Sequence, residues 1–151
     1  MAKRKQLPKD LGFPKNGKQP IAHIVETIGH PKWKFSKFVR DSKYQLPFDS
    51  ADVFRELFSK LKNFETMTWQ SIMQSTHGTG GSNSHFISID SLSPTGRGLI
   101  ENNSLFEYSE GLFSLRLQGA QRLLGYLFED TLFIFWYDPD HSTVLTKKKH
   151  T

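Results

Sequence analysis

Cysteine is absent from this chain of 151 residues. Its absence excludes disulfide bonds, cysteine nucleophiles and zinc sites built from thiolates. The sequence also lacks any run that approaches the roughly 18 apolar residues of a membrane-spanning helix. No apolar stretch follows the charged start MAKRKQLPKD, so we expect no signal peptide. These absences favour a cytoplasmic protein that does not enter a membrane.

Acidic residues are scarce at the two ends of the chain. The first 43 residues hold 11 Lys or Arg against three Asp or Glu, a net charge of +8, whereas residues 44–146 carry a net charge of −6. Residues 1–20 contain three Pro, two Gly and few large apolar side chains, which predicts a flexible basic arm. Residues 147–151 form a basic tail. We therefore expect a single domain over residues 21–146 that meets a polyanion only locally.

Two helices are predicted in the first half of the domain. Apolar side chains recur at helical spacing between residues 53 and 61, after a suitable N-cap at Asp49 or Ser50. A second, shorter helix is expected to begin near Thr66 or Thr68, because apolar residues again follow at helical spacing. The sequence thus predicts two linked helices.

Strand-like patterns occur before the two predicted helices and dominate the second half of the chain. Residues 21–39 predict a short helix and then a strand, and residues 85–90 a brief alternating strand between loops at 76–84 and 91–98. Three longer runs follow in close succession, which predicts an antiparallel meander. These runs are LFSLRLQ at 112–118, RLLGYLF at 122–128 and TLFIFWYD at 131–138. The fold class is therefore α+β, with helices packed on one face of a mostly antiparallel sheet.

The register of the last hairpin can be predicted from its turn. If Glu129 and Asp130 form a two-residue turn, Arg122 lies opposite Tyr137. The more aliphatic face is then expected to carry the helices. That face comprises Leu123, Gly125, Leu127, Leu132, Ile134 and Trp136.

The same register gathers polar side chains at one end of the sheet. They are Arg116, Gln118, Arg122, Asp138, Asp140 and His141. Arg116 shares a face with Arg122 only if the loop between them has an odd number of residues. Two guanidinium groups suit a phosphate, and histidine can move a proton near neutral pH. This set fits cleavage of RNA by its own 2′-hydroxyl, without a metal or other cofactor.

The residues of this region resemble a known family. The run SLRLQGAQRLLGY, followed by a turn, an apolar strand and His141, resembles the C-terminal half of RelE/ParE superfamily toxins, above all the YoeB-like branch. The resemblance covers about residues 112–141, and residues 50–74 fit the fold's helical hairpin more loosely. It implies a RelE-like fold and a type II toxin that cuts mRNA, in a ribosome-dependent manner, until an antitoxin binds it.

The resemblance also implies roles for individual residues. The family's catalytic arginine matches Arg122, its second basic position Arg116 and its closing histidine His141. Asp138 or Asp140 would support the histidine. Two features depart from the family: Asp-Pro-Asp intervenes before His141, and Ser142 follows where the family has tyrosine. The acidic residue that serves as base is left open among Glu101, Asn102, Glu107 and Glu110.

Other residues are candidates for contacts with RNA, and each has a plainer interpretation. Tyr126 suits either base stacking or the core. The remaining candidates are Gln118, Lys147, Lys148 and Lys149. The arginines can equally be solvated strand residues, and His141 can be an ordinary turn residue.

Two other functions compete with the nuclease. One is a non-catalytic toxin of the ParE kind, which poisons gyrase by binding. The other is a nucleic-acid-binding or phage accessory protein with the same fold and no activity.

Overall fold

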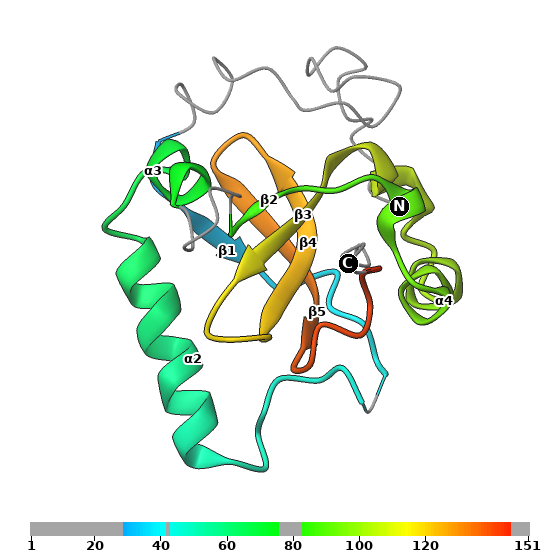
Figure 1. The fold of residues 1–151 in the computed structure, drawn as a ribbon, viewed down its shortest axis with the longest axis horizontal. Helices are drawn as coiled ribbons and strands as arrows, with labels where there is room; N and C mark the ends of the chain where they lie inside the picture. The colour runs from blue at the N-terminus through cyan, green and yellow to red at the C-terminus, as the bar shows by residue number, and fades with distance from the viewer. Residues whose placement is uncertain (1–28, 42, 76–82, 146–151) are drawn as a thin grey trace, which may run out of the picture.

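The computed structural model describes residues 29–41, 43–75 and 83–145 (Figure 1). The predicted arm, the predicted tail and the predicted helix between residues 21 and 28 lie outside these residues. The described elements follow one another as β1 (Lys32–Lys34), α2 (Ala51–Phe64), α3 (Trp69–Gln74), β2 (His85–Phe86), η1 (Ile89–Ser91), α4 (Pro94–Asn102), η2 (Phe106–Gly111), β3 (Leu112–Arg116), β4 (Arg122–Phe128) and β5 (Thr131–Asp138).

These strands form one five-stranded sheet in the order β1-β5-β4-β3-β2. All neighbouring strands are antiparallel except β1 and β5, which run parallel. The predicted meander is confirmed, because β3, β4 and β5 are consecutive in the sheet. The fold is therefore α+β with a mostly antiparallel sheet.

The two predicted helices begin where capping chemistry places them. Ser50 caps α2 by accepting a hydrogen bond from the backbone N–H of Val53, and Thr68 caps α3 in the same way from Ser71. The strand expected within residues 33–39 is shorter than predicted, because a turn follows Lys34 and the amide of Phe38 bonds back to Phe35.

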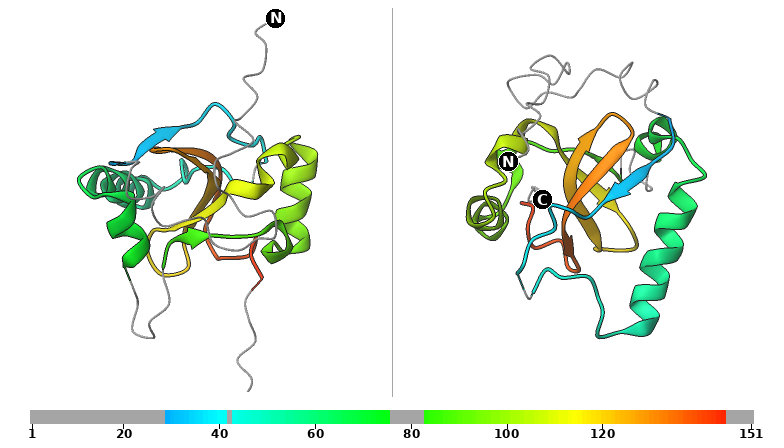
Figure 2. Two further views of the ribbon diagram at one scale, coloured as in Figure 1. Left: turned by 90° about the horizontal axis from the view of Figure 1, so that it is seen from above. Right: turned by 180° about the vertical axis from the view of Figure 1, so that it is seen from behind.

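Helices cover both faces of the sheet, not one as the sequence predicted. Figures 1 and 2 show α2 and α3 on one side and α4 on the other. The first core joins α2 and α3 to the sheet through side chains that include Leu57, Trp69 and Leu127. The second core joins α4 to the opposite face through side chains that include Ile100 and Phe135. Since both faces of the β4–β5 hairpin are apolar, each must be covered.

Helix α4 lies where the sequence predicted a loop. Its Ser93 side chain accepts a hydrogen bond from the backbone N–H of Gly96, and Pro94 occupies the first turn, where a missing N–H costs nothing. The Ser, Pro and Gly residues that suggested a loop are thus the start of a helix. The strand predicted at residues 85–90 is also shorter, since only His85–Phe86 pairs before η1 begins.

A β-bulge changes the predicted register of the last hairpin. Gly125 pairs with Ile134 but Leu124 pairs with Trp136, so Phe135 is an extra residue on β5. Trp136 therefore lies in the second core, on the face opposite to the one predicted. The partner of Arg122 becomes Asp138.

Candidate functional site

Three polar residues stand in a row across the end of the meander. Arg116 of β3 pairs with Arg122 of β4, and Arg122 pairs with Asp138 of β5. The loop between the two arginines has five residues, an odd number, so both arginines belong to the same face of the sheet. The structure thus brings together the two predicted guanidinium groups.

Each arginine is held by neutral oxygen atoms. The Nη1 atom of Arg116 donates to Oδ1 of Asn83 at 2.7 Å, while its backbone N–H donates to Oγ of Ser84 at 3.0 Å. Nη1 of Arg122 donates to the backbone oxygens of Gly119 at 2.7 Å and Gln121 at 3.0 Å. Neither guanidinium forms an ion pair with any residue that the structure describes. Two half-buried positive charges therefore lie side by side, and no described carboxylate forms a direct ion pair with either.

Burial lowers the pKa of Arg122, and the positive charge of Arg116 lowers it further. The carboxylate of Asp138 acts in the opposite direction. Because an arginine side chain stays protonated in proteins, this shift costs free energy without removing the charge. Such a pair of like charges is stabilised by an anion that binds between them.

The carboxylate of Asp138 accepts hydrogen bonds from the turn that follows β5. It is fully buried, and its two oxygens accept hydrogen bonds from the backbone N–H groups of Asp140, Ser142 and Thr143 and from the hydroxyls of Ser142 and Thr143. This bonding uses the acceptor positions of the carboxylate. Asp138 therefore organises the turn that carries His141.

The other side of the turn rests on α4 and the segment before α2. The hydroxyl of Ser93 donates to the backbone oxygen of Ser142 at 2.7 Å, and the backbone N–H of Ser93 donates to the oxygen of Thr143 at 2.9 Å. Tyr44 and Ser142 share a hydrogen bond of 3.1 Å between their hydroxyls. Gly96 lets α4 approach this closely, because a Cβ there would overlap the backbone oxygen of Thr143. The turn is thus fixed from both sides.

His141 projects from this fixed turn in a left-handed backbone conformation, with φ of 60°. Histidine is among the residues that tolerate this region better than most. Burial lowers the pKa of His141, and the nearby positive charge of Arg122 lowers it further, against the carboxylate of Asp138. At neutral pH the imidazole is therefore mainly neutral, which suits a general base.

The remaining predicted site residues lie in different places. Asp140 is exposed on the same turn as His141. Gln118 is exposed in the β3–β4 loop, where its backbone oxygen accepts a bond from Gln121. Glu101 is exposed in the last turn of α4, and no hydrogen bond or ion pair links it to the arginines within the described part of the chain. Lys147, Lys148 and Lys149 lie outside the described residues.

Tyr126 belongs to the core and does not form a stacking platform. Its side chain is 4% exposed and packs against Tyr108, Phe128 and Phe133 in the second core. Burial raises the pKa of Tyr126 to about 12. A base cannot stack on this ring, so the predicted RNA contact at Tyr126 is wrong.

Sequence reasoning missed the residues that support the site from a distance. Asn83, which binds Arg116, is 33 positions away, and Tyr44, which binds Ser142, is 98 positions away. No periodic pattern encodes contacts of this kind. Ser93 did carry a signal, since serine followed by proline is typical of a helix start.

Among the residues that the structure describes, no three His, Asp or Glu side chains gather into a metal-binding group. None of the described helices is both long and apolar enough to cross a membrane. Comparisons with protein-family models, with curated proteins and with solved structures found no match to this chain.

Proposed function

We propose that this protein is a RelE-like toxin that cleaves the phosphodiester backbone of mRNA. The observation that carries the proposal is the pairing of Arg116 with Arg122 beside His141 at one end of the sheet. Two adjacent guanidinium groups, with no described ion-pair partner, form a site for a phosphate. The neighbouring neutral imidazole supplies the base that the reaction needs.

The chemistry follows from these groups. His141 accepts the proton of a ribose 2′-hydroxyl, and the resulting oxygen attacks the adjacent phosphorus. Arg116 and Arg122 stabilise the negative charge that grows on the phosphorane. The bond to the 5′-oxygen then breaks, the 5′-oxygen takes a proton from water, and His141 releases its proton to water. The products are a 2′,3′-cyclic phosphate and a 5′-hydroxyl. No step requires a metal ion.

The sequence resemblance over residues 112–141 supports the family part of the proposal. Two linked helices, α2 and α3, come before the three-stranded meander in the chain, with β2, η1, α4 and η2 between them. The departure at Asp-Pro-Asp has a physical reason, because Asp138 anchors the turn that holds His141. By the same resemblance, the ribosome presents the mRNA and an antitoxin protein neutralises the toxin as a heterocomplex.

The test is expression of the wild-type chain and of two variants in growing cells. Wild type should arrest growth and cut translated mRNA, whereas His141→Asn and Arg122→Gln should relieve the arrest. Arg55→Gln is the matched control, because Arg55 lies exposed on α2 and pairs only with Asp52 among the described residues. Thermal melting must show that all variants stay folded.

Two results would contradict the nuclease. Intact mRNA during growth arrest would point instead to a non-catalytic toxin of the ParE kind. RNA cleavage that persists in both His141→Asn and Arg122→Gln would exclude the proposed site.

A further inference from the structure

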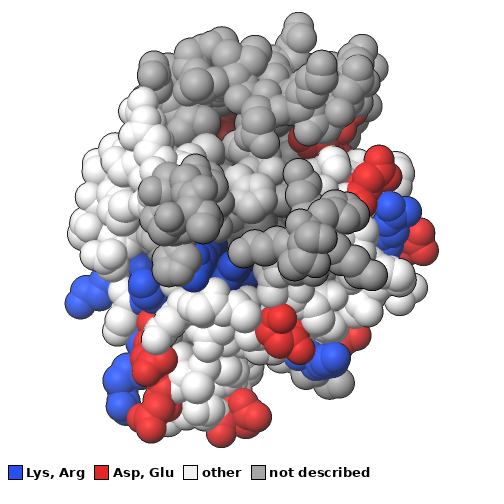
Figure 3. Space-filling view, in the orientation of Figure 1, with Lys and Arg blue, Asp and Glu red and all other residues white. Residues whose placement is uncertain are grey.

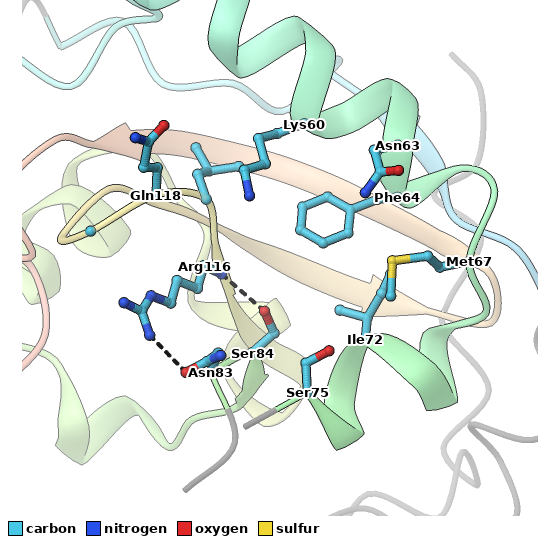
Figure 4. Close-up of a pocket in the computed structure, with 12 residues that line it drawn as sticks. Lys60, Asn63, Phe64, Met67, Ile72, Ser75, Asn83, Ser84, Arg116 and Gln118 are labelled. Carbon is cyan, nitrogen blue, oxygen red and sulfur yellow. Dashed lines mark hydrogen bonds between the residues drawn. The ribbon is translucent and has the colours of Figure 1, made fainter. Parts of the chain in front are cut away.

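A groove runs beside the arginine pair, between the helices α2 and α3 and the end of β3. Its volume is about 440 Å³, within the range of small-molecule sites. Figure 4 shows Lys60, Asn63 and Phe64 reaching from α2 on one side, with Arg116, Asn83 and Ser84 opposite. Arg116 therefore borders both this groove and the proposed catalytic site.

The charge of the groove favours an anionic ligand. Among the described residues that line it, Lys60 and Arg116 carry the charge and none is a carboxylate. Lys60 has no ion pair with any described residue. Elsewhere on this face, acidic and basic side chains are interspersed, as at the lower left of Figure 3, where α2 lies in Figure 1. The positive character is therefore local to the groove.

The groove also offers groups that recognise a nucleobase. Three carboxamides line it, from Asn63 of α2, Asn83 before β2 and Gln118 after β3. A carboxamide both donates and accepts hydrogen bonds, as the edge of a base requires. The ring of Phe64 lies among them and is held edge-on by Trp33, with centroids 6.5 Å apart. Aromatic rings of this kind stack on unpaired bases.

We infer that this groove binds the nucleotide next to the scissile phosphate, with the base between α2 and β3 and the phosphates near Lys60 and Arg116. This inference rests on the proposed function, since it makes single-stranded RNA the ligand. A peptide is the other polymer that could enter, but two cations and no carboxylate among the described lining residues favour the polyanion. The groove would then set the nucleotide preference of the enzyme.

The experiment measures binding of short 2′-O-methyl RNA oligonucleotides, which cannot be cleaved, by fluorescence anisotropy. We expect Lys60→Ala to weaken binding about three- to tenfold and to reduce the salt dependence by roughly one phosphate contact. Lys62→Ala should leave both unchanged. It is the matched control, because Lys62 is also exposed on α2 but is not among the residues that line the groove.

Base recognition is tested with four oligonucleotides that differ at a single position. Wild type should prefer one of them, and Asn63→Ala or Gln118→Ala should reduce that preference. Equal losses of RNA affinity in Lys60→Ala and Lys62→Ala would overturn the inference, because they would show that RNA is attracted by the overall charge of α2. Three other results would also overturn the inference. They are unchanged RNA affinity in Lys60→Ala, equal affinity of wild type for all four oligonucleotides, and no binding of RNA by wild type.

The experiments give different results if the RNA-binding role of the groove is wrong and if the nuclease activity is wrong. If Lys60→Ala cuts RNA with wild-type rate and site preference, the groove is excluded while the nuclease stands. If wild type binds the oligonucleotides through Lys60 yet cuts no RNA, the nuclease is excluded while the groove stands.

Discussion

Replacing Asp138 by Asn tests whether this buried carboxylate holds the turn that carries His141. The substitution keeps the size of the side chain and changes one acceptor oxygen into an NH2 group. In the native turn, both oxygens accept hydrogen bonds only. In Asp138→Asn, the new NH2 group must therefore face an N–H or O–H donor of Ser142 or Thr143.

The expected loss in the free energy of unfolding follows from these hydrogen bonds. A hydrogen bond to a charged group contributes about 1.5–3 kcal/mol and a neutral one about 0.5–1.5 kcal/mol, so each surviving bond loses about 1 kcal/mol. A buried donor without an acceptor costs a further 1–3 kcal/mol or so. With three backbone N–H groups bound to Asp138, we expect Asp138→Asn to lower the free energy of unfolding by about 3–5 kcal/mol.

The assay is urea unfolding followed by tryptophan fluorescence. Trp136 reports on this region directly, because its indole N–H donates to Oγ1 of Thr143 at 3.1 Å. Asp140→Asn is the control, since it removes the same charge from an exposed residue two positions away and should cost less than about 1 kcal/mol. A loss below about 1 kcal/mol for Asp138→Asn, or equal losses for both variants, would refute the reasoning.

Two further predictions concern the bulge and the histidine. Gly125→Ala should destabilise the protein by about 2–3 kcal/mol, because a Cβ there would overlap the backbone oxygen of Phe133. Gly98→Ala on α4 is the control, because a Cβ at Gly98 would have no other atom within 4 Å. Urea unfolding should show that Gly98→Ala raises the free energy of unfolding by up to about 1 kcal/mol. Equal effects of the two substitutions would contradict the close approach at the bulge. The pKa of His141 is lower in the folded protein than its unfolded value of roughly 6.5. The neutral imidazole therefore contributes stability above about pH 6.5, and this contribution is lost as the pH falls through the folded pKa. Wild type should therefore lose stability relative to His141→Asn between pH 7.5 and 5, and a constant difference would show that the imidazole is not perturbed.

The sequence predicted elements well where local chemistry decides them. Ser50 and Thr68, each one of two residues that the sequence offered as a helix start, cap α2 and α3, since an N-cap needs only a side-chain oxygen and the amides two or three residues later. The meander was also predictable, because alternating or apolar runs separated by short turns leave few other arrangements. The sequence leaves the pairing of Arg116 with Arg122 conditional on an odd loop, and the five-residue loop of the structure decides it.

Prediction failed where the decisive contact is remote in sequence. The bulge at Phe135 depends on how β5 pairs with β4, and the strand pattern of β5 alone does not reveal it. Helix α4 was missed because Ser, Pro and Gly are common both in loops and at helix starts. The sequence could not decide between the core and an RNA contact for Tyr126, because only the packing of α4 and η2 decides which face of the sheet is covered.

The sequence by itself therefore determined the α+β class, the two capped helices, the meander and the end of the sheet at which Arg116 and Arg122 lie. These features follow from periodicity, capping and turn length, which act over a few residues. The tertiary structure alone decided that Asp138 serves the turn, that Asn83 holds Arg116, and that a groove opens beside it. Such features arise when distant segments pack together, because hydrogen bonds and cavities between segments depend on positions in space rather than on spacing along the chain.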